Sequence, residues 1–443
     1  MTTLLETPDS WPHVTLAPAR EEPLLGLAEA QRAGAWTAWR RAVTELAPEA
    51  LTDTVARAGL CGRGGAGFPA AQKWRACRAA PGPERYAVAN GYEADPGVSI
   101  DRTLMERDPH AVVEGLALAA FAAGASSAFL AVKAGYGLAL ERLRAAVAQA
   151  EEAGILGIDA LGAGIDLQIE VRPVQGAFIL GEETALLRAL EGKRGMPDQR
   201  PPYPAVRGLF GRPTVVHNVE TLAAIPWIVR NGAAAFAEIG REGAHGTKLV
   251  QLSGAVRTPG IAEVPMGVPL GEVLETAGGG MAKGSTFKAL LVGGPAGGFL
   301  PEAVLETPLD FDNLRQAGAI VGSGSLLAVD QRACIVELGR LMERFMSDES
   351  CGKCIPCRIG TRRLLEIGDR FTGGRTRPTD PTLLRDLSAD VVDGSLCGHG
   401  INAPNPLLSG MRYFGEEYDA HISAGTCPAG VCRPLRILAS ASR

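Results

Sequence analysis

The sequence lacks an excess of basic charge and has few aromatic residues. Its 443 residues include 44 Lys and Arg against 49 Asp and Glu, and only 5% are Phe, Trp or Tyr. Without a domain-wide basic surface, the chain is not expected to bind nucleic acid. The first residues, MTTLLETPDSWP, contain neither a basic nor an apolar segment, so we expect no export signal.

Long apolar runs are also scarce. The least charged stretch is GLALAAFAAGASSAFLAV, residues 115–132. Its length alone would permit a membrane span, but Ala, Gly and Ser dominate it and Gly124 interrupts it. A buried helix, a turn and a buried strand fit this pattern better. We therefore expect a cytoplasmic chain, soluble or peripheral in a larger complex, with no span of its own.

The remaining chain predicts several domains of mixed α/β structure. Apolar strands alternate with helical runs between residues 85 and 240, which is typical of an α/β domain with a largely parallel sheet. The predicted boundaries are an irregular lead with helices (1–60), the α/β domain (61–243), a small α+β module (244–330) and a helical region (331–443).

The first motif with chemical potential is GRGGAGFPAAQKW, residues 62–74. Gly62 and Gly65 would let the backbone approach a ligand closely. Arg63 and Lys73 offer positive charges to a phosphate at the start of a helix. The spacing matches neither the GxGxxG dinucleotide loop nor the Walker loop. A tight turn between a strand and a helix remains the alternative.

Three further motifs carry polar residues at the ends of predicted elements. ANGYEADPG (89–97) follows an apolar strand, where α/β sheets bind ligands; its polar residues are Asn90, Glu93 and Asp95. In GEETALL, Glu182 and Glu183 stand at a helix start, and in HNVETL so do Asn218 and Thr221. For the first motif a solvated turn is the alternative, and for the other two it is helix capping.

Cysteine spacing gives the strongest signal. Nine cysteines in a chain without an export signal indicate metal binding rather than disulfides. Cys351, Cys354 and Cys357 form C-x2-C-x2-C, which with one remote thiolate is typical of a [4Fe–4S] cluster. Cys397, flanked by glycines in LCGHG, is the predicted fourth ligand. Zinc or a disulfide is the alternative.

Four of these motifs together resemble one family. GRGGAGFP, GEETALL.ALEGKRG, GRPT..HNVETL and ESCGKC.PCR are similar to motifs of the NADH-oxidising flavoprotein subunit of respiratory complex I. They resemble still more closely its relatives in NAD-linked formate dehydrogenases and hydrogenases. The resemblance covers about residues 30–435. It implies a Rossmann-like domain for FMN and NADH, a ubiquitin-like β-grasp (SLBB) domain and a C-terminal four-helix [4Fe–4S] domain.

The resemblance also implies site residues. Its FMN contacts correspond to Gly62, Arg63, Gly65, Lys73, Asn90, Glu93, Gly181, Glu182, Glu183, Asn218 and Thr221. Its NADH pocket corresponds to Phe68, which would stack on adenine, and to Glu183, Arg200 and Tyr203. Glu93, Asp95 and Glu183 are the candidate catalytic residues. Hydride would pass from NAD(H) to FMN and single electrons to the cluster, without an acid or base from the protein.

Some positions depart from the family pattern. Tyr92 stands where an aspartate is usual beside the flavin, Phe178 where tyrosine is common, Leu180 where cysteine is, and His217 where asparagine is. Tyr92 removes a charge and adds bulk, so it could shift the flavin potential or hinder nicotinamide entry. NAD use is therefore a weaker expectation than flavin binding.

A second group of thiols remains outside the cluster. His421, Cys427 and Cys432 form H-x5-C-x4-C, and Cys334 is a remote partner. Together they would make a tetrahedral Cys3His zinc site, which would hold the C-terminal tail to the first helix of the cluster domain. Ordinary buried thiols are the alternative, and this is how we interpret Cys61 and Cys77.

The expected function is that of a diaphorase subunit in a larger oxidoreductase. The sequence shows neither a thioredoxin-like [2Fe–2S] domain nor an appended ferredoxin domain, so such carriers are expected on other subunits. The predicted partners are a small thioredoxin-like [2Fe–2S] subunit and a larger iron–sulfur or catalytic subunit of the formate dehydrogenase or hydrogenase type. The alternatives are the complex I subunit itself and a non-catalytic electron-transfer or scaffold module that no longer binds NADH.

Overall fold

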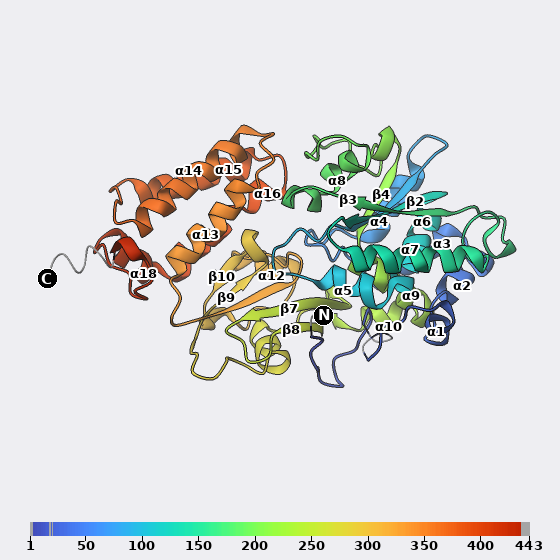
Figure 1. Cartoon of the computed structure of the whole chain (residues 1–443), viewed down its shortest axis with the longest axis horizontal. Coiled ribbons are helices and arrows are strands. Elements are labelled where there is room, and N and C mark those ends of the chain that lie inside the picture. Colours follow the sequence, from blue (N-terminus) through green and yellow to red (C-terminus); the bar gives the residue numbers. More distant parts are fainter. Residues whose placement is uncertain (1–2, 17–18, 20, 436–443) are drawn as a thin grey trace. The chain divides into compact units, whose positions relative to one another are not determined.

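The computed structural model describes residues 3–16, 19 and 21–435 (Figure 1). The chain forms two compact units, Met1–Val250 with Ile261–Val268, and Gln251–Gly260 with Pro269–Arg443. Within the described ranges, every helix is too short or too polar to cross a lipid bilayer.

A four-stranded sheet organises the first unit. Its strands are β1 (Tyr86–Gly91), β2 (Ser127–Lys133), β3 (Gln168–Val174) and β4 (Thr214–Asn218). Their order is β3-β2-β1-β4 and each neighbouring pair is parallel. The predicted parallel sheet is thereby confirmed, with β4 as a strand that the sequence analysis did not identify.

Helices surround this sheet (Figure 1). They are α1 (Leu27–Arg32), α2 (Thr37–Glu45), α3 (Pro48–Ala58), α4 (Ala70–Ala79), α5 (Ile100–Arg107), α6 (Pro109–Ala123), α7 (Gly137–Glu152), α8 (Glu183–Leu190), α9 (Val219–Asn231) and α10 (Ala233–Ala237). Helix α6 is buried almost all round and ends at Gly124, whose φ of 78° is left-handed, before β2 begins. The predicted helix, turn and strand are thus confirmed. Gly115 lets α6 approach α9 closely, because a Cβ there would lie 2.1 Å from the Leu222 carbonyl oxygen.

The irregular lead is held by one buried carboxylate. Glu263 Oε1 accepts hydrogen bonds from the Val14 and Thr15 N–H groups, and its Oε2 accepts one from Leu16. Burial would raise the pKa of Glu263, but these bonds and those from neighbouring side chains lower it below its usual value. The lead therefore docks without regular structure.

A second sheet has the order β10-β9-β11-β7-β8. Its strands are β7 (Thr247–Gly254), β8 (Gly260–Pro265), β9 (Phe287–Val292), β10 (Gly298–Leu300) and β11 (Ser325–Asp330), and α11 (Leu270–Glu272) and α12 (Phe311–Gln316) lie between strands in the sequence. Strand β11 pairs antiparallel with β9 and parallel with β7. The short strands β5 (Gly240–Arg241) and β6 (Ala244–His245) form a separate ribbon.

The C-terminal region is helical, as predicted. It contains α13 (Ile335–Asp348), α14 (Ile355–Thr372), α15 (Asp380–Gly394) and α17 (Asn405–Tyr413), together with the short α16 (Gly398–Asn402) and α18 (Gly415–Ile422). Helix α14 packs against both α13 and α15, and α13 also contacts α17. Within this predicted helical region the segment 405–422 forms two helices, α17 and α18, because Phe414 between them has non-helical dihedrals of −121° and 39°.

Candidate functional site

The glycine-rich turn forms a closed loop in front of α4. The Gly62 N–H donates to the Phe68 carbonyl at 2.9 Å. Gly65 has a φ of 115°, a conformation that favours glycine. Among the described residues no side chain caps α4, which begins at Ala70, so N–H groups of its first turn can bind an anion. The loop and the helix start therefore fit a phosphate group.

Two contacts hold this turn against the start of α9. The Arg63 N–H donates to Thr221 Oγ1 at 2.8 Å. Gly64 lies so close to Asn218 that a Cβ on Gly64 would be 2.9 Å from the Asn218 Cβ. Hence the first and fourth motifs, far apart in the sequence, meet here.

The other two motifs join them at the carboxyl edge of the sheet. Asn90, at the end of β1, is the register partner of Asn218, at the end of β4. Asn90 Nδ2 donates to the Gly181 carbonyl at 3.0 Å, which brings the segment before α8 to the same edge. Ligands of α/β sheets bind at this edge. The structure therefore gathers four motifs at one place: GRGGAGFP, ANGYEADPG, GEETALL and HNVETL.

Part of this polar set caps helices. Glu182 Oε2 accepts the N–H groups of Thr184 and Ala185, both at 2.9 Å, at the start of α8. Asn218 Oδ1 accepts the N–H of Glu220 at 2.9 Å at the start of α9. The capping role considered for both helix starts is therefore real, and it orients these side chains.

Lys73 belongs to an ion-pair network. Its Nζ lies 2.6 Å from Glu183 Oε2 and donates to the Val216 carbonyl at 3.1 Å. Arg200 lies 3.4 Å from the other Glu183 oxygen. Helix α4, helix α8 and the loop after α8 are thus joined by charge, with two cations around one carboxylate. Arg200 also lies 3.8 Å from Glu182 Oε1, so the network as a whole joins two cations and two carboxylates.

The Arg63 side chain points elsewhere. It is only 2% exposed, and its guanidinium donates to the His245 carbonyl. Burial lowers the pKa of Arg63, while Glu220 acts in the opposite direction. Because the guanidinium is enclosed and the Arg63 N–H donates to Thr221 Oγ1, Arg63 holds the turn in place and does not present its charge at the turn.

Glu93 is also turned inward. Its carboxylate is buried and accepts the N–H groups of Asp101 (2.7 Å) and Arg102 (3.2 Å) and the hydroxyl of Tyr136 (2.9 Å). Burial raises the pKa of Glu93 despite these bonds. Asp101, which sequence reasoning missed, accepts a hydrogen bond from Asn218 Nδ2 at 2.7 Å. No local pattern marks Asp101, since it lies within the helical run IDRTLMER.

The predicted nucleotide-contacting aromatics are at the surface. Phe68 is 48% and Tyr203 58% exposed, and the Arg200 guanidinium lies 5.9 Å from the centre of the Tyr203 ring. Asp95 is half-buried, and its carbonyl accepts the N–H of Val98. Large exposed rings are suited to stacking on a base.

The departures from the family pattern are accommodated inside the protein. Tyr92 is 2% exposed, with the Lys133 ammonium 5.5 Å from its ring centre. His217 accepts a hydrogen bond from the Trp74 indole at 2.7 Å, and burial lowers the pKa of His217 to about 3. Leu180 is buried, and Phe178 begins the short 3-10 helix Phe178–Gly181. The Tyr92 ring is therefore packed away from open solvent.

The four predicted cluster cysteines come together around the start of α14. Cys351 and Cys354 lie in the turn after α13, Cys357 in the first turn of α14, and Cys397 at the N-cap of α16. Burial raises the pKa of Cys357 to about 12, and Cys354, Cys397 and Cys351 each raise it as well. Gly400 permits the close approach, since a Cβ there would lie 2.9 Å from the Cys357 Cβ.

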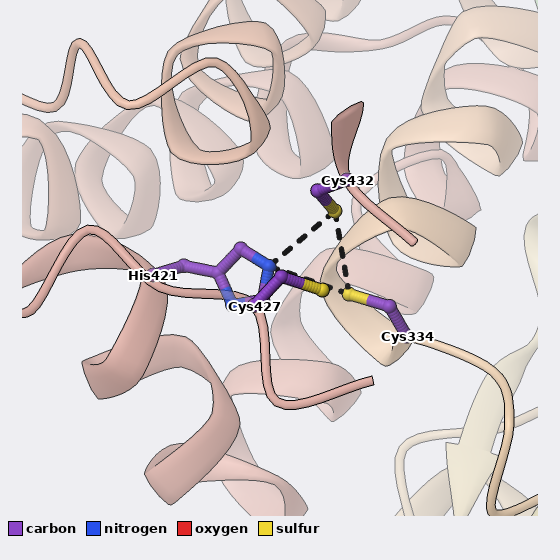
Figure 2. A group of neighbouring side chains, drawn as sticks. All are labelled: Cys334, His421, Cys427 and Cys432. Carbon is purple, nitrogen blue, oxygen red and sulfur yellow. Dashed lines mark hydrogen bonds between the residues drawn. The ribbon is translucent and has the colours of Figure 1, made fainter. Parts of the chain in front are cut away.

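The second thiol group is also assembled. The ligand atoms of Cys334, His421, Cys427 and Cys432 all lie within 4.8 Å of one another (Figure 2). Cys77 is buried in α4 and is not part of either group.

The fold and these sites define the class of NADH-oxidising flavoprotein subunits that carry FMN and a [4Fe–4S] cluster. Three family models match the chain: the Nuo51 FMN-binding domain (residues 55–227), the SLBB domain (249–304) and the NADH-ubiquinone oxidoreductase-F iron-sulfur binding region (337–421). These matches confirm the predicted FMN, β-grasp and [4Fe–4S] regions.

Individual relatives agree. The chain is 44% identical over 393 residues to the NADP-reducing hydrogenase subunit HndC of Solidesulfovibrio fructosivorans, covering 89% of this chain and 80% of the relative. It is 41% identical to an NADH-quinone oxidoreductase subunit of Rhizobium meliloti, covering 89% and 94%. A crystal structure of an NAD+-reducing [NiFe]-hydrogenase superposes with a TM-score of 0.82 at 34% identity, covering 96% of this chain and 68% of that one. The chain therefore belongs to this family.

Proposed function

We propose that the chain is the diaphorase subunit of a multi-subunit oxidoreductase of the NAD-linked hydrogenase or formate dehydrogenase type, located in the cytoplasm. The similarity to HndC and to the NAD+-reducing hydrogenase supports this assignment. The complex I subunit is the second candidate, favoured by the 41% identity to the NADH-quinone oxidoreductase relative. The thiol group at the C-terminal tail favours the hydrogenase branch, which the tail sequence CPAGVC resembles.

One observation carries the FMN proposal: four separate motifs meet at the carboxyl edge of the parallel sheet. In this proposal the N–H groups of Gly64 and Gly65 and the start of α4 bind the phosphate, because the Gly62 and Arg63 N–H groups already donate to the Phe68 carbonyl and to Thr221 Oγ1. Lys73 supplies a positive charge, and Asn90 and Asn218 bond polar groups of the flavin. Bound FMN accepts a hydride and releases electrons singly.

The chain's own residues would then orient the nucleotide. Phe68 offers an exposed ring on which adenine can stack. Arg200 lies beside Glu183, and the Tyr203 ring lies beside Arg200. Glu93 and Asp95 shape the segment after β1; Glu93 has a left-handed φ of 43°, which its three buried hydrogen bonds hold in place. These residues position the nucleotide and exclude water from it, and none of them needs to move a proton.

For the cluster, we propose Cys351, Cys354, Cys357 and Cys397 as ligands, because the start of α16 lies against Cys357 at Gly400 and the other three thiols are close enough to Cys357 to raise its pKa. Beside them, Ile355 and Ile359 on α14 are 65% and 47% exposed. Apolar surface next to a cluster suits docking of a partner. We assign this surface to a small thioredoxin-like [2Fe–2S] subunit or to a larger iron–sulfur subunit.

The test is an NADH titration of the anaerobically reconstituted chain. We expect bound flavin to be bleached by NADH and ferricyanide to be reduced. Phe68→Ala should raise KM for NADH roughly 2- to 10-fold, which is the loss of affinity expected when one aromatic stacking contact is removed. Phe210→Ala is the matched control, because Phe210 is 52% exposed and lies outside the four motifs. Bound flavin that NADH does not bleach would instead support a non-catalytic electron-transfer module.

A further inference from the structure

Four potential metal ligands outside the cluster set meet near the start of α13. Cys334 is the N-cap of α13, His421 lies in the last turn of α18, and Cys427 and Cys432 lie in the irregular segment that follows α18. Figure 2 shows the imidazole and the thiols pointing toward one another. Among the described residues this is the one group of three or more such side chains with ligand atoms this close.

The distances between the ligand atoms match those around a single zinc ion. Zinc bonds of about 2.3 Å to sulfur and about 2.05 Å to nitrogen, arranged tetrahedrally, place two sulfurs about 3.8 Å apart and a sulfur and a nitrogen about 3.6 Å apart. The Sγ atoms of Cys334 and Cys432 are 3.8 Å apart, and they lie 3.4 and 3.5 Å from His421 Nε2. A disulfide would need sulfurs about 2.05 Å apart.

The imidazole is oriented for coordination through Nε2. Its Nδ1 lies 2.7 Å from the Glu417 carbonyl oxygen, so Nδ1–H donates there and the Nε2 lone pair faces the thiols. Such a second hydrogen bond commonly fixes a histidine that binds metal. The Glu417 carboxylate is held in turn by the Ile335 N–H at 3.2 Å and by Lys288 Nζ at 2.9 Å.

Burial makes the group unlike a set of ordinary surface thiols. Cys334 and His421 are each 1% exposed and Cys432 is 4% exposed, while Cys427 is half-buried. Ile335 and other apolar side chains of the same core surround them. Without a metal, His421 Nε2 has only the Cys334 and Cys432 thiols as partners among the residues that the structure describes, and thiols are weak hydrogen-bond donors. A metal ion would replace these weak contacts with bonds to all four ligands.

We propose that Cys334, His421, Cys427 and Cys432 bind one Zn2+ in a closed structural site that fastens the segment 423–432 to α13 and α18. Binding deprotonates the three thiols and releases their protons. Four protein ligands leave no open position for a substrate, as in structural zinc sites. The three-sulfur, one-nitrogen tetrahedron favours zinc over the oxygen-binding divalent ions.

The segment has little else to hold it. Between α18 and Cys432 it contains no helix or strand, and its backbone bonds include Thr426 N–H to the Ala420 carbonyl and Gly430 N–H to the Cys427 carbonyl. Two of its residues are metal ligands in the proposal. The ion would therefore replace regular secondary structure as the tie between this segment and the helices.

The experiment measures zinc and iron in the purified full chain by mass spectrometry after a weak chelator wash. We expect about one zinc per chain in addition to the cluster iron. Cys427→Ser, at the most exposed ligand, should lower zinc affinity more than the roughly 10- to 100-fold that follows loss of a residue hydrogen-bonded to a metal ligand, while iron is retained. Cys77→Ala, which removes a buried thiol outside the group, should retain both metals.

A second readout covers variants that fold poorly. Cobalt added to zinc-stripped unmutated protein should produce the visible bands of tetrahedral thiolate-bound cobalt, and metal removal should speed thermolysin cleavage before Val431, which is 46% exposed. Full iron without zinc, together with no cobalt spectrum, would overturn the proposal. So would additional iron that Cys427→Ser removes, because that would reveal a second iron–sulfur centre. Neither readout depends on flavin or NADH, so a failure of the diaphorase assignment would remain separate.

Discussion

The two thiol groups of the C-terminal region differ in how they are buried. In the cluster set, Cys351 and Cys354 are half-buried in a turn, whereas Cys357 and Cys397 are each 5% exposed. In the second group, which we call the tail site (Cys334, His421, Cys427 and Cys432), three of the four ligands are fully enclosed. The cluster set therefore has two half-buried ligands, whereas the tail site has one, Cys427.

This difference in burial fits two different functions, electron transfer for the cluster and structural support for the tail site. A cluster that exchanges electrons with a partner must lie near the surface, and its potential depends on that exposure. A structural ion needs only a closed tetrahedron. The sequence spacing agrees, since three cluster ligands come from one seven-residue run, while the tail site joins segments 87 or more residues apart at Cys334 and His421.

The largest expected effect is the loss of the cluster in Cys397→Ala. Removing the one ligand outside the run should lower iron from about four atoms per chain to near zero, while zinc and flavin stay bound. Iron and zinc analysis beside the flavin spectrum measures this. Cys427→Ser should give the converse result, so the two variants test whether the sites are independent. Equal loss of both metals in either variant would contradict the comparison.

Much of the fold follows from local patterns in the sequence. Helix α6 and strand β2 were predictable because an Ala-rich run is cut by a single glycine at Gly124. Helix α3 begins with Pro48 and ends before Gly59, which has a left-handed φ of 69°. The cysteine run begins in the turn between α13 and α14, and its last member, Cys357, lies in the first turn of α14.

Long-range contacts could not be predicted in this way. Nothing local shows that Asp101 meets Asn218 across 117 residues, or that Glu263 holds the lead at Val14. The direction of the Arg63 side chain depends on the His245 carbonyl, which lies 182 residues away. Side-chain direction is set by packing between distant segments, so a motif gives the residue type at a site but not the atom that faces the ligand.

A smaller effect, confined to the first unit, is expected for Gly64→Ala. The added Cβ would press on Asn218 at 2.9 Å and shift the turn, and overpacking of about 1–3 kcal/mol corresponds to a roughly 5- to 150-fold weaker FMN affinity. Flavin titration of the apoprotein measures it. Gly135→Ala is the control, because a Cβ there has no neighbour within 4 Å. Iron and zinc should be unchanged in both; a loss of either would tie the thiol sites to the flavin site.

The smallest predicted effect is a pH dependence of the free energy of unfolding of the first unit, which should be opposite in sign to that of the thiol sites. Glu114 in α6 is fully buried, with Trp39 N–H 2.9 Å from one oxygen and Arg230 3.8 Å from the other. Burial raises the pKa of Glu114 from 4.5 to about 7. The folded state therefore holds this proton more tightly than the unfolded state does. The resulting stability is present below the unfolded pKa and is lost as pH rises toward 7.

Acid should act in the opposite direction on the thiol sites, because protons compete with metal for cysteine and histidine. For the first unit, we expect the free energy of unfolding to fall on the order of 1 kcal/mol between about pH 5.5 and pH 7. Denaturant unfolding followed by flavin fluorescence measures this, and Glu114→Gln should flatten the slope because its amide does not titrate. An equal slope in the variant would assign the pH dependence to another group. A fall in flavin-reported stability on acidification would show that the metal sites, rather than Glu114, govern the first unit as well.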